Sequence, residues 1–153
     1  MSELKGNLLL VDDEELLLEN TKILLEDIAD NIFTASRGKE ALKIIQENEI
    51  HAIICDIHMP EMSGVEVIQE VRKLNIETPF IFYTAHGDRE LMKQAIKYGA
   101  FDFLNKPYMD DLEEITINAL KYGLSQKGLA PAKEASEDQL ITEYQKMLSE
   151  VKK

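Results

Sequence analysis

Short apolar runs and amphipathic stretches alternate regularly through residues 1–123. Each apolar run is four or five residues long, and in the stretch that follows it apolar residues recur every three or four positions. Short apolar runs predict buried strands, whereas the longer spacing predicts helices that bury one face. The predicted strands are Asn7–Val11, Asn31–Ala35, Ala52–Cys55, Phe80–Tyr83 and Phe101–Leu104. The pattern therefore predicts five strand–helix units.

Nearly all-apolar strands that alternate with helices are typical of a parallel sheet covered by helices on both faces. The sequence therefore predicts an α/β fold with a doubly wound five-stranded parallel sheet and five helices. Two residues at the ends of the fourth helix agree with this interpretation. Asp88 is predicted to cap its start, and Gly99 to adopt a left-handed conformation at its end.

The chain changes character after Gly123. Residues 1–123 are predicted to form the folded domain, and residues 124–135, which include Gly128 and Pro131, a linker. Residues 136–153 are predicted to form an amphipathic helical tail, with apolar residues along one face. That face could dock on the domain, pair with another chain or begin a longer coiled segment, and the sequence leaves these alternatives open.

The net charge of −12 is carried by residues 1–123, which hold 12 Lys and Arg residues against 24 Asp and Glu residues. Residues 124–153 hold five of each kind. Because nucleic acids and anionic membranes attract a basic face, we expect neither as a partner. A helix-turn-helix module also needs more helices than this short, charge-balanced tail can supply.

The sequence favours a cytoplasmic location. No apolar run approaches the roughly 20 residues that span a bilayer, and the N-terminus lacks the pattern of a secretory signal. The single cysteine, Cys55, lies within an apolar run, so we expect a buried thiol and no disulfide.

Polar residues that are candidates for a functional site follow four of the five predicted strands. Asp12 and Asp13 follow the first strand, Asp56 the third, Thr84 the fourth and Lys106 the fifth. Ligand sites of doubly wound folds lie beyond the carboxyl ends of the strands, so we expect these side chains to converge. Three clustered carboxylates need a cation, and oxygen ligands favour Mg²⁺. Magnesium beside an aspartate, a lysine and a hydroxyl is typical of phosphoryl transfer.

Four sequence segments, taken in this order, resemble the receiver domains of two-component response regulators. The resemblance extends from residue 7 to about residue 123 and implies a flavodoxin-like sheet with the strand order 2-1-3-4-5. The segments are Leu10–Glu14, Asp56–Pro60 with Gly64 following, Thr84-Ala85, and Gly99–Pro107.

The resemblance assigns roles to the acidic residues. Asp56 would be the phosphoacceptor, and Asp13, Asp56 and the backbone carbonyl of His58 would bind Mg²⁺. Asp12 would assist through a water molecule. The receiver would promote only its own phosphorylation and dephosphorylation, and would not otherwise be an enzyme.

The resemblance also assigns the phosphoryl-binding and switch residues. Lys106 would pair with the phosphoryl oxygens and Thr84 would donate a hydrogen bond to them. Phe103 would turn into the space that Thr84 vacates, although it lacks the hydroxyl of the commoner tyrosine. The Lys106–Pro107 peptide bond would be cis, which is plausible for proline in a tight turn.

Two histidines flank the predicted site at equivalent offsets. His58 lies two residues after Asp56, and His86 lies two residues after Thr84. One hypothesis is that they tune the hydrolysis of the phosphorylated state. The alternatives are exposed loop residues without a role or, less favoured, a transition-metal site.

The expected partners follow from the same resemblance. A histidine kinase or a histidine phosphotransfer protein would donate the phosphoryl group, and output would pass to a protein target through the surface of the fourth helix, fifth strand and fifth helix. A homodimer through the receiver or the C-terminal helix is possible. The chain could instead be a phosphorelay intermediate, or a fragment of a larger regulator or hybrid kinase.

Two functions of other classes are disfavoured by particular residues. A flavin-binding protein on this scaffold would place a flavin phosphate beside Asp12, Asp13 and Glu14, which would repel it. A phosphatase with an aspartyl-phosphate intermediate would need a second acid close to Asp56, and Asp56-Ile57-His58 offers none.

Overall fold

The structure is a computed structural model in which residues 5–85, 89–107 and 109–126 are described. The predicted tail and all but the first three residues of the predicted linker lie outside these ranges, as do His86 and the predicted helix cap Asp88.

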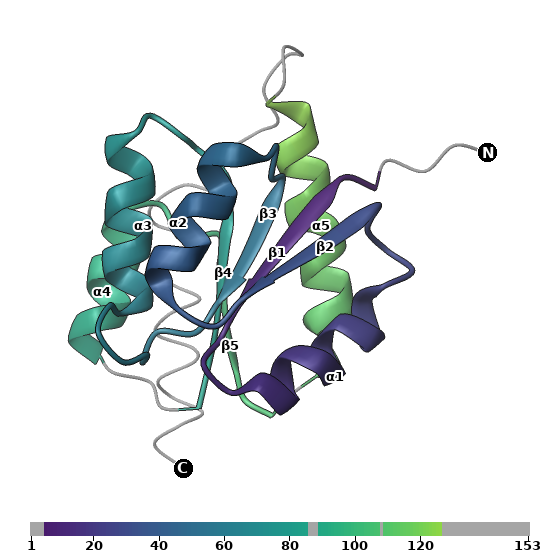
Figure 1. Cartoon of the computed structure of the whole chain (residues 1–153), viewed down its shortest axis with the longest axis horizontal. Coiled ribbons are helices and arrows are strands. Elements are labelled where there is room, and N and C mark those ends of the chain that lie inside the picture. The colour runs from purple at the N-terminus through teal and green to yellow at the C-terminus, as the bar shows by residue number, and fades with distance from the viewer. Residues whose placement is uncertain (1–4, 86–88, 108, 127–153) are drawn as a thin grey trace.

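The described residues contain one five-stranded sheet in which all paired strands are parallel and the order is β2-β1-β3-β4-β5 (Figure 1). This confirms the predicted doubly wound sheet and the strand order that the resemblance implied. The strands are β1 (Asn7–Val11), β2 (Asn31–Ala35), β3 (Ala52–Cys55), β4 (Phe80–Thr84) and β5 (Asp102–Asn105).

The predicted bounds of the last two strands need correction. β4 ends one residue later than predicted, at Thr84, and β5 lies one residue further along the chain than predicted. The register pairs Ile81 with Asp102 and Thr84 with Asn105, so backbone pairing includes polar residues that an apolar pattern omits. Phe101 is only half-buried, with its ring centroid 5.7 Å from that of Tyr122.

In the part of the chain that the structure describes, five helices cover the two faces of the sheet, with α2, α3 and α4 on one face and α1 and α5 on the other (Figure 1). α5 continues two residues past Gly123, the predicted domain boundary. The helices are α1 (Glu15–Leu25), α2 (Gly38–Glu47), α3 (Gly64–Lys73), α4 (Arg89–Lys97) and α5 (Leu112–Ser125).

Among residues 5–85, 89–107 and 109–126, the alternation of side chains along each strand gives two hydrophobic cores. In β1, Leu9 packs under α2 and α3, whereas Leu8 and Leu10 pack under α1 and α5. Both faces of β1, β3 and β4 are therefore buried, which explains why these strands appear as nearly continuous apolar runs. Cys55 lies in the first core and is 1% exposed, as predicted.

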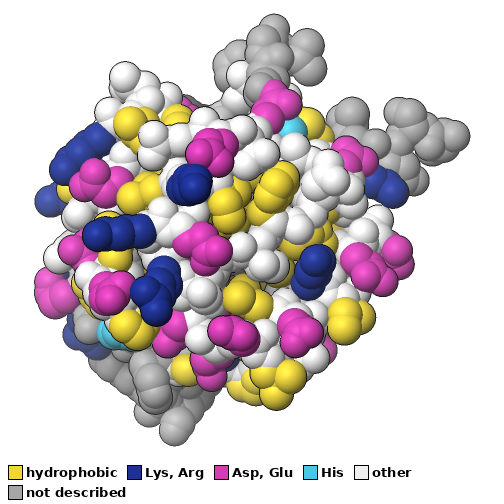
Figure 2. Space-filling view, viewed as in Figure 1, with side chains coloured by type: hydrophobic (Ala, Val, Ile, Leu, Met, Phe, Trp, Pro, Cys, Tyr) yellow, Lys and Arg dark blue, Asp and Glu magenta, His cyan; other side chains and the backbone are white. Residues whose placement is uncertain are grey.

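Charged side chains of both signs are interspersed on the face seen in Figure 2. Apolar side chains appear between them in small groups rather than as one continuous surface. Among the described residues, no helix combines the length and the apolar character needed to cross a membrane.

Arg72, in the last turn of α3, joins α3 to the carboxyl end of α4. Its Nε donates a hydrogen bond to the carbonyl of Tyr98 at 2.8 Å, and its Nη1 donates to the carbonyls of Ile76 and Thr78 at 2.9 Å. The guanidinium also lies over the ring of Phe80, 5.6 Å from the centroid. Gly99 follows with φ of 84°, the left-handed conformation predicted at the end of α4.

His51, at the amino end of β3, is expected to make stability depend on pH. Its buried imidazole accepts a hydrogen bond at Nδ1 from the backbone N–H of Asn7, at 2.9 Å. Burial lowers the pKa of His51, against a smaller opposing effect of Asp30. In the unfolded chain the imidazole takes up a proton near its ordinary pKa of about 6.5, whereas the folded protein resists this, so stability falls as pH drops below that value.

The measurement is the free energy of unfolding in urea at pH 7.5 and pH 5.5. The wild type is expected to lose stability at the lower pH, and a His51→Asn variant is expected to lose less, because the amide oxygen accepts the same bond without titrating. His58→Asn, at an exposed histidine, is the control and should keep the wild-type loss. An equal loss in His51→Asn and the wild type would contradict the prediction.

Candidate functional site

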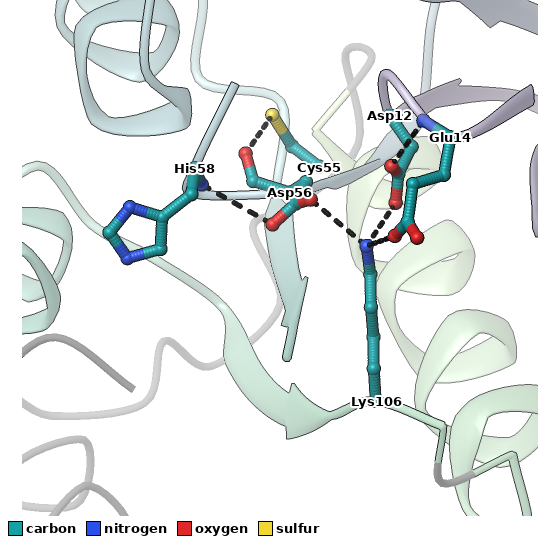
Figure 3. A network of polar contacts seen from close by, with 6 residues as sticks. All are labelled: Asp12, Glu14, Cys55, Asp56, His58 and Lys106. Atoms are coloured by element: carbon teal, nitrogen blue, oxygen red, sulfur yellow. Dashed lines mark hydrogen bonds and ion pairs between the residues drawn. The ribbon is translucent and has the colours of Figure 1, made fainter. Parts of the chain in front are cut away.

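The carboxyl ends of the central strands bring together side chains that are far apart in sequence. Asp12 follows β1, Asp56 follows β3 and Lys106 follows β5, and Figure 3 shows the three side chains meeting. Asp12 and Asp56 are buried, with exposures of 5% and 6%, whereas Asp13 is exposed. The convergence of these residues predicted from strand order is therefore present in the structure.

Lys106 is the centre of this arrangement. Its Nζ lies 2.7 Å from Asp12 Oδ2, 2.9 Å from Asp56 Oδ2 and 2.8 Å from Glu14 Oε1. Burial alone would lower the pKa of Lys106, but its hydrogen bonds to the three carboxylates outweigh that effect and raise the pKa above its ordinary value. The ammonium therefore remains charged and holds two strand ends and the start of α1 together.

Asp12 has a structural role beside its contact with Lys106. Its Oδ1 accepts a hydrogen bond at 2.9 Å from the backbone N–H of Glu14, the residue that precedes α1. Burial raises the pKa of Asp12, and the hydrogen bonds from Lys106 and from the Glu14 backbone act in the opposite direction. The pKa of Asp12 stays raised despite these two hydrogen bonds, because burial is the largest effect.

Asp12, Asp13 and Asp56 form an acidic cluster that could hold a metal ion. One carboxylate oxygen of each lies within 4.8 Å of the other two. The exposed Asp13 lies on the solvent side of the cluster, while the other two aspartates are buried. A set of carboxylate oxygens without sulfur or imidazole ligands fits a hard divalent cation.

Asp56 is the first residue of the loop between β3 and α3, and later residues of this loop and the start of α3 pack against it. The His58 N–H donates to Asp56 Oδ1 at 3.3 Å, and the Gly64 N–H donates to the Ile57 carbonyl at 2.8 Å. The imidazole of His58 is exposed and points away from Asp56 (Figure 3). A Cβ atom added at Gly64 would overlap the backbone carbonyl oxygen of Asp56. This close approach explains why glycine begins α3.

The predicted switch residues lie at the ends of β4 and β5. Thr84 is 1% exposed, and its carbonyl accepts a hydrogen bond at 2.8 Å from the Lys106 N–H. Phe103 is buried with its ring stacked on that of Phe82, at a centroid distance of 5.9 Å. The Lys106–Pro107 peptide bond is cis, as the resemblance implied. The backbone of β4 therefore helps to position Lys106.

Two features of the site were not predicted from sequence. Glu14 was treated only as part of an acidic motif, yet its carboxylate contacts Lys106 although its side chain is 62% exposed. Tyr83 was treated as an apolar strand residue, but it lines a pocket together with Asp12 and Asp56. The sequence signal that could have indicated this is the hydroxyl group of a tyrosine in a strand predicted to be buried, directly before Thr84.

The geometry agrees with the family to which the sequence is similar. The sequence model of the response regulator receiver domain matches residues 8–121. The chain belongs to this family. The receiver match includes the five strands except for the first residue of β1, together with the acidic cluster and Lys106.

Two curated relatives carry the receiver sequence within longer proteins. The transcriptional regulatory protein CrdR of Helicobacter pylori is 34% identical over 112 residues, which is 72% of this chain and 53% of that protein. The transcriptional regulatory protein ZraR of Escherichia coli is 31% identical over 149 residues, 95% of this chain and 34% of that protein. This receiver thus spans from about a third to about half of these relatives.

A solved structure agrees with the described fold. The signal receiver domain of an HD domain-containing protein from Pseudomonas fluorescens superposes with a TM-score of 0.75 at 27% sequence identity. The superposition covers 80% of this chain and 99% of the other. The receiver domain is therefore a flavodoxin-like domain homologous to those of two-component response regulators.

Proposed function

We propose that this receiver accepts a phosphoryl group on Asp56 in a Mg²⁺-dependent reaction and so switches its contacts with a protein target. The observation that supports the proposal most directly is the placement of Lys106 Nζ within 2.9 Å of both Asp12 and Asp56 at the rim of the sheet. A nucleophilic carboxylate, an ammonium and further carboxylates are the groups that phosphoryl transfer requires.

The proposed step is an in-line displacement at phosphorus. A carboxylate oxygen of Asp56 forms a bond to phosphorus while the bond from phosphorus to the donor's leaving group breaks, and the leaving group departs with that electron pair. With acetyl phosphate the leaving group is acetate. Lys106 carries three N–H donors, so it can bind a phosphoryl oxygen while it keeps a contact to Asp12.

The cation site would be formed by Asp12, Asp13 and Asp56, together with the backbone carbonyl of His58. When bound, Mg²⁺ supplies positive charge that offsets the clustered carboxylates and the phosphoryl oxygens. Asp13 is the most accessible of the three carboxylates, so we infer that it presents the first ligand to an ion from solvent.

The proposed switch connects the site to the surface formed by α4, β5 and α5. The Thr84 hydroxyl would donate a hydrogen bond to the phosphoryl group, and Phe103, which packs on Phe82, would turn into the space that Thr84 vacates. The proposed donors are a histidine kinase or a histidine phosphotransfer protein, acting in the cytoplasm. A two-state equilibrium biased by one covalent group is sufficient for such a switch.

Removal of the metal is the test of this function. Intact-protein mass spectrometry after incubation with acetyl phosphate and Mg²⁺ is expected to show a gain of one phosphoryl group, ~80 Da from its formula. The same incubation with a chelator in excess over Mg²⁺ is expected to show no gain. An unmodified mass in the presence of Mg²⁺ would contradict the proposal, and an equal gain in the chelator would contradict its metal dependence.

A further inference from the structure

A small pocket lies beneath the acidic cluster, between α1 and the sheet. Its volume is about 10 Å³. That is room for about one water molecule. Leu17, Leu18 and Thr21 line it from the helix side, and Leu10 and Ile54 from the sheet. Its remaining lining includes Asp12 and Asp56, so the pocket adjoins the buried carboxylates of the site.

Tyr83 also lines this pocket, and its hydroxyl is the unusual feature there. The residue is 2% exposed, and its hydroxyl oxygen makes no hydrogen bond to any described residue. Buried hydroxyl groups are nearly always hydrogen-bonded, because leaving one without a partner loses the bond it made to water. An aliphatic residue at this strand position would fill the core without that cost.

The hydroxyl of Tyr83 can act as a hydrogen-bond donor. Burial raises its pKa, and the charges of Lys106 and Asp12 act on it in opposite directions, so it keeps its proton at neutral pH. Asp12 already accepts from Lys106 at one oxygen and from the Glu14 N–H at the other. An ionised carboxylate has about four acceptor positions, so Asp12 can accept another hydrogen bond.

We propose that the pocket holds one ordered water that accepts a hydrogen bond from the Tyr83 hydroxyl and donates one to the Asp12 carboxylate. Tyr83 is then a positioning residue: it acts on the cation site through Asp12 and touches neither the ion nor the phosphoryl group. The inference rests on the Mg²⁺-dependent function proposed above. Its specific consequence is that removal of the Tyr83 hydroxyl, which lies on the α1 side of the sheet, weakens cation binding by the acidic cluster at the carboxyl end of the sheet.

The functional test compares Tyr83→Phe with the wild type. The variant keeps the ring and removes only the hydroxyl oxygen. The Mg²⁺ dissociation constant, measured by calorimetry with Mg²⁺ alone, is expected to rise roughly fivefold, the factor that one hydrogen bond of typical strength represents. The Mg²⁺ concentration that half-saturates phosphorylation by acetyl phosphate should rise by the same factor, with an unchanged rate at saturating Mg²⁺ and an unchanged melting temperature.

Tyr98→Phe is the matched control. Tyr98 follows α4 at the opposite end of the sheet and is 36% exposed, so loss of its hydroxyl should leave the Mg²⁺ dissociation constant unchanged. A purely structural role of Tyr83 would instead appear as a lower melting temperature without a shift in Mg²⁺ affinity. That result would overturn the inference, as would equal affinities of Tyr83→Phe and the wild type.

Crystal structures of the wild type and Tyr83→Phe give an independent test. The wild type is expected to show a water within hydrogen-bond distance of both the Tyr83 hydroxyl and an Asp12 oxygen, and the variant is expected to lack it. A dry pocket in the wild type would overturn the inference whatever the titration shows. If the wild type instead held the water but bound no Mg²⁺, the bridge would stand and the proposed function would fall.

Discussion

Asp56→Asn is expected to gain no phosphoryl group under conditions in which the wild type is fully modified. The amide has nearly the shape of the carboxylate but lacks its nucleophilic charge, so the acceptor is lost while the packing of the site is kept. Asp56 is the buried carboxylate whose Oδ2 lies 2.9 Å from Lys106 Nζ and whose Oδ1 accepts the His58 N–H. Intact-protein mass spectrometry after incubation with acetyl phosphate and Mg²⁺ measures the effect.

A matched control separates loss of the acceptor from loss of one negative charge. Asp27→Asn removes an exposed carboxylate just beyond the end of α1 and should be phosphorylated like the wild type. If Asp56→Asn still gained the phosphoryl mass, the acceptor would be another residue. Peptide mapping of the modified protein would then decide between Asp12 and Asp13.

Gly64→Ala is expected to lower the free energy of unfolding by about 3 kcal/mol, the upper part of the range for overpacking. The added Cβ would overlap the carbonyl oxygen of Asp56, a backbone atom that can move only with the loop between β3 and α3. The backbone of Gly64 does not have positive φ, so steric overlap rather than strain causes the loss. Because Asp56 itself must shift, phosphorylation by acetyl phosphate should also slow.

Gly38→Ala is the comparison that isolates this effect. Gly38 also begins a helix, but a Cβ there would meet the side chain of Met62, which can rotate away. Its cost in a urea denaturation experiment should stay below about 1 kcal/mol, since flexible side chains absorb small overlaps. Equal losses in the two variants would show that contact with the Asp56 backbone is not what makes Gly64 necessary.

The order of the elements could be predicted because this fold buries both faces of its sheet. β1, β2 and β3 have the predicted bounds. β5 was placed one residue early because its pairing includes the polar Asp102 and Asn105. Backbone pairing makes no distinction between apolar and polar side chains, so an apolar pattern alone cannot locate such an end.

The centre of the site could be predicted for a related reason. Parallel strands place their carboxyl ends at one rim, so strand order alone brings Asp12, Asp56 and Lys106 together. The contact of Glu14 with Lys106 depends instead on how α1 begins, and the position of the Tyr83 hydroxyl depends on how α1 packs on the sheet. Both are consequences of side-chain conformation and helix placement, which residue spacing does not specify. The assigned roles of Thr84, Phe103 and the two histidines remain predictions.

The contacts of Arg72 have a mechanical consequence for α4. The carbonyls that follow this helix, at Tyr98 and Gly99, are tied to a guanidinium that is itself fixed to the segment before β4. A rigid displacement of α4 is then a rotation about its carboxyl end. At 1.5 Å per residue the nine-residue helix is about 13 Å long, so a rotation of about 10° moves its first turn by about 2 Å. The carboxyl end of α4 is then the fixed point of the rotation. The largest displacement is at the amino end of the helix, the end that is closer in sequence to Thr84.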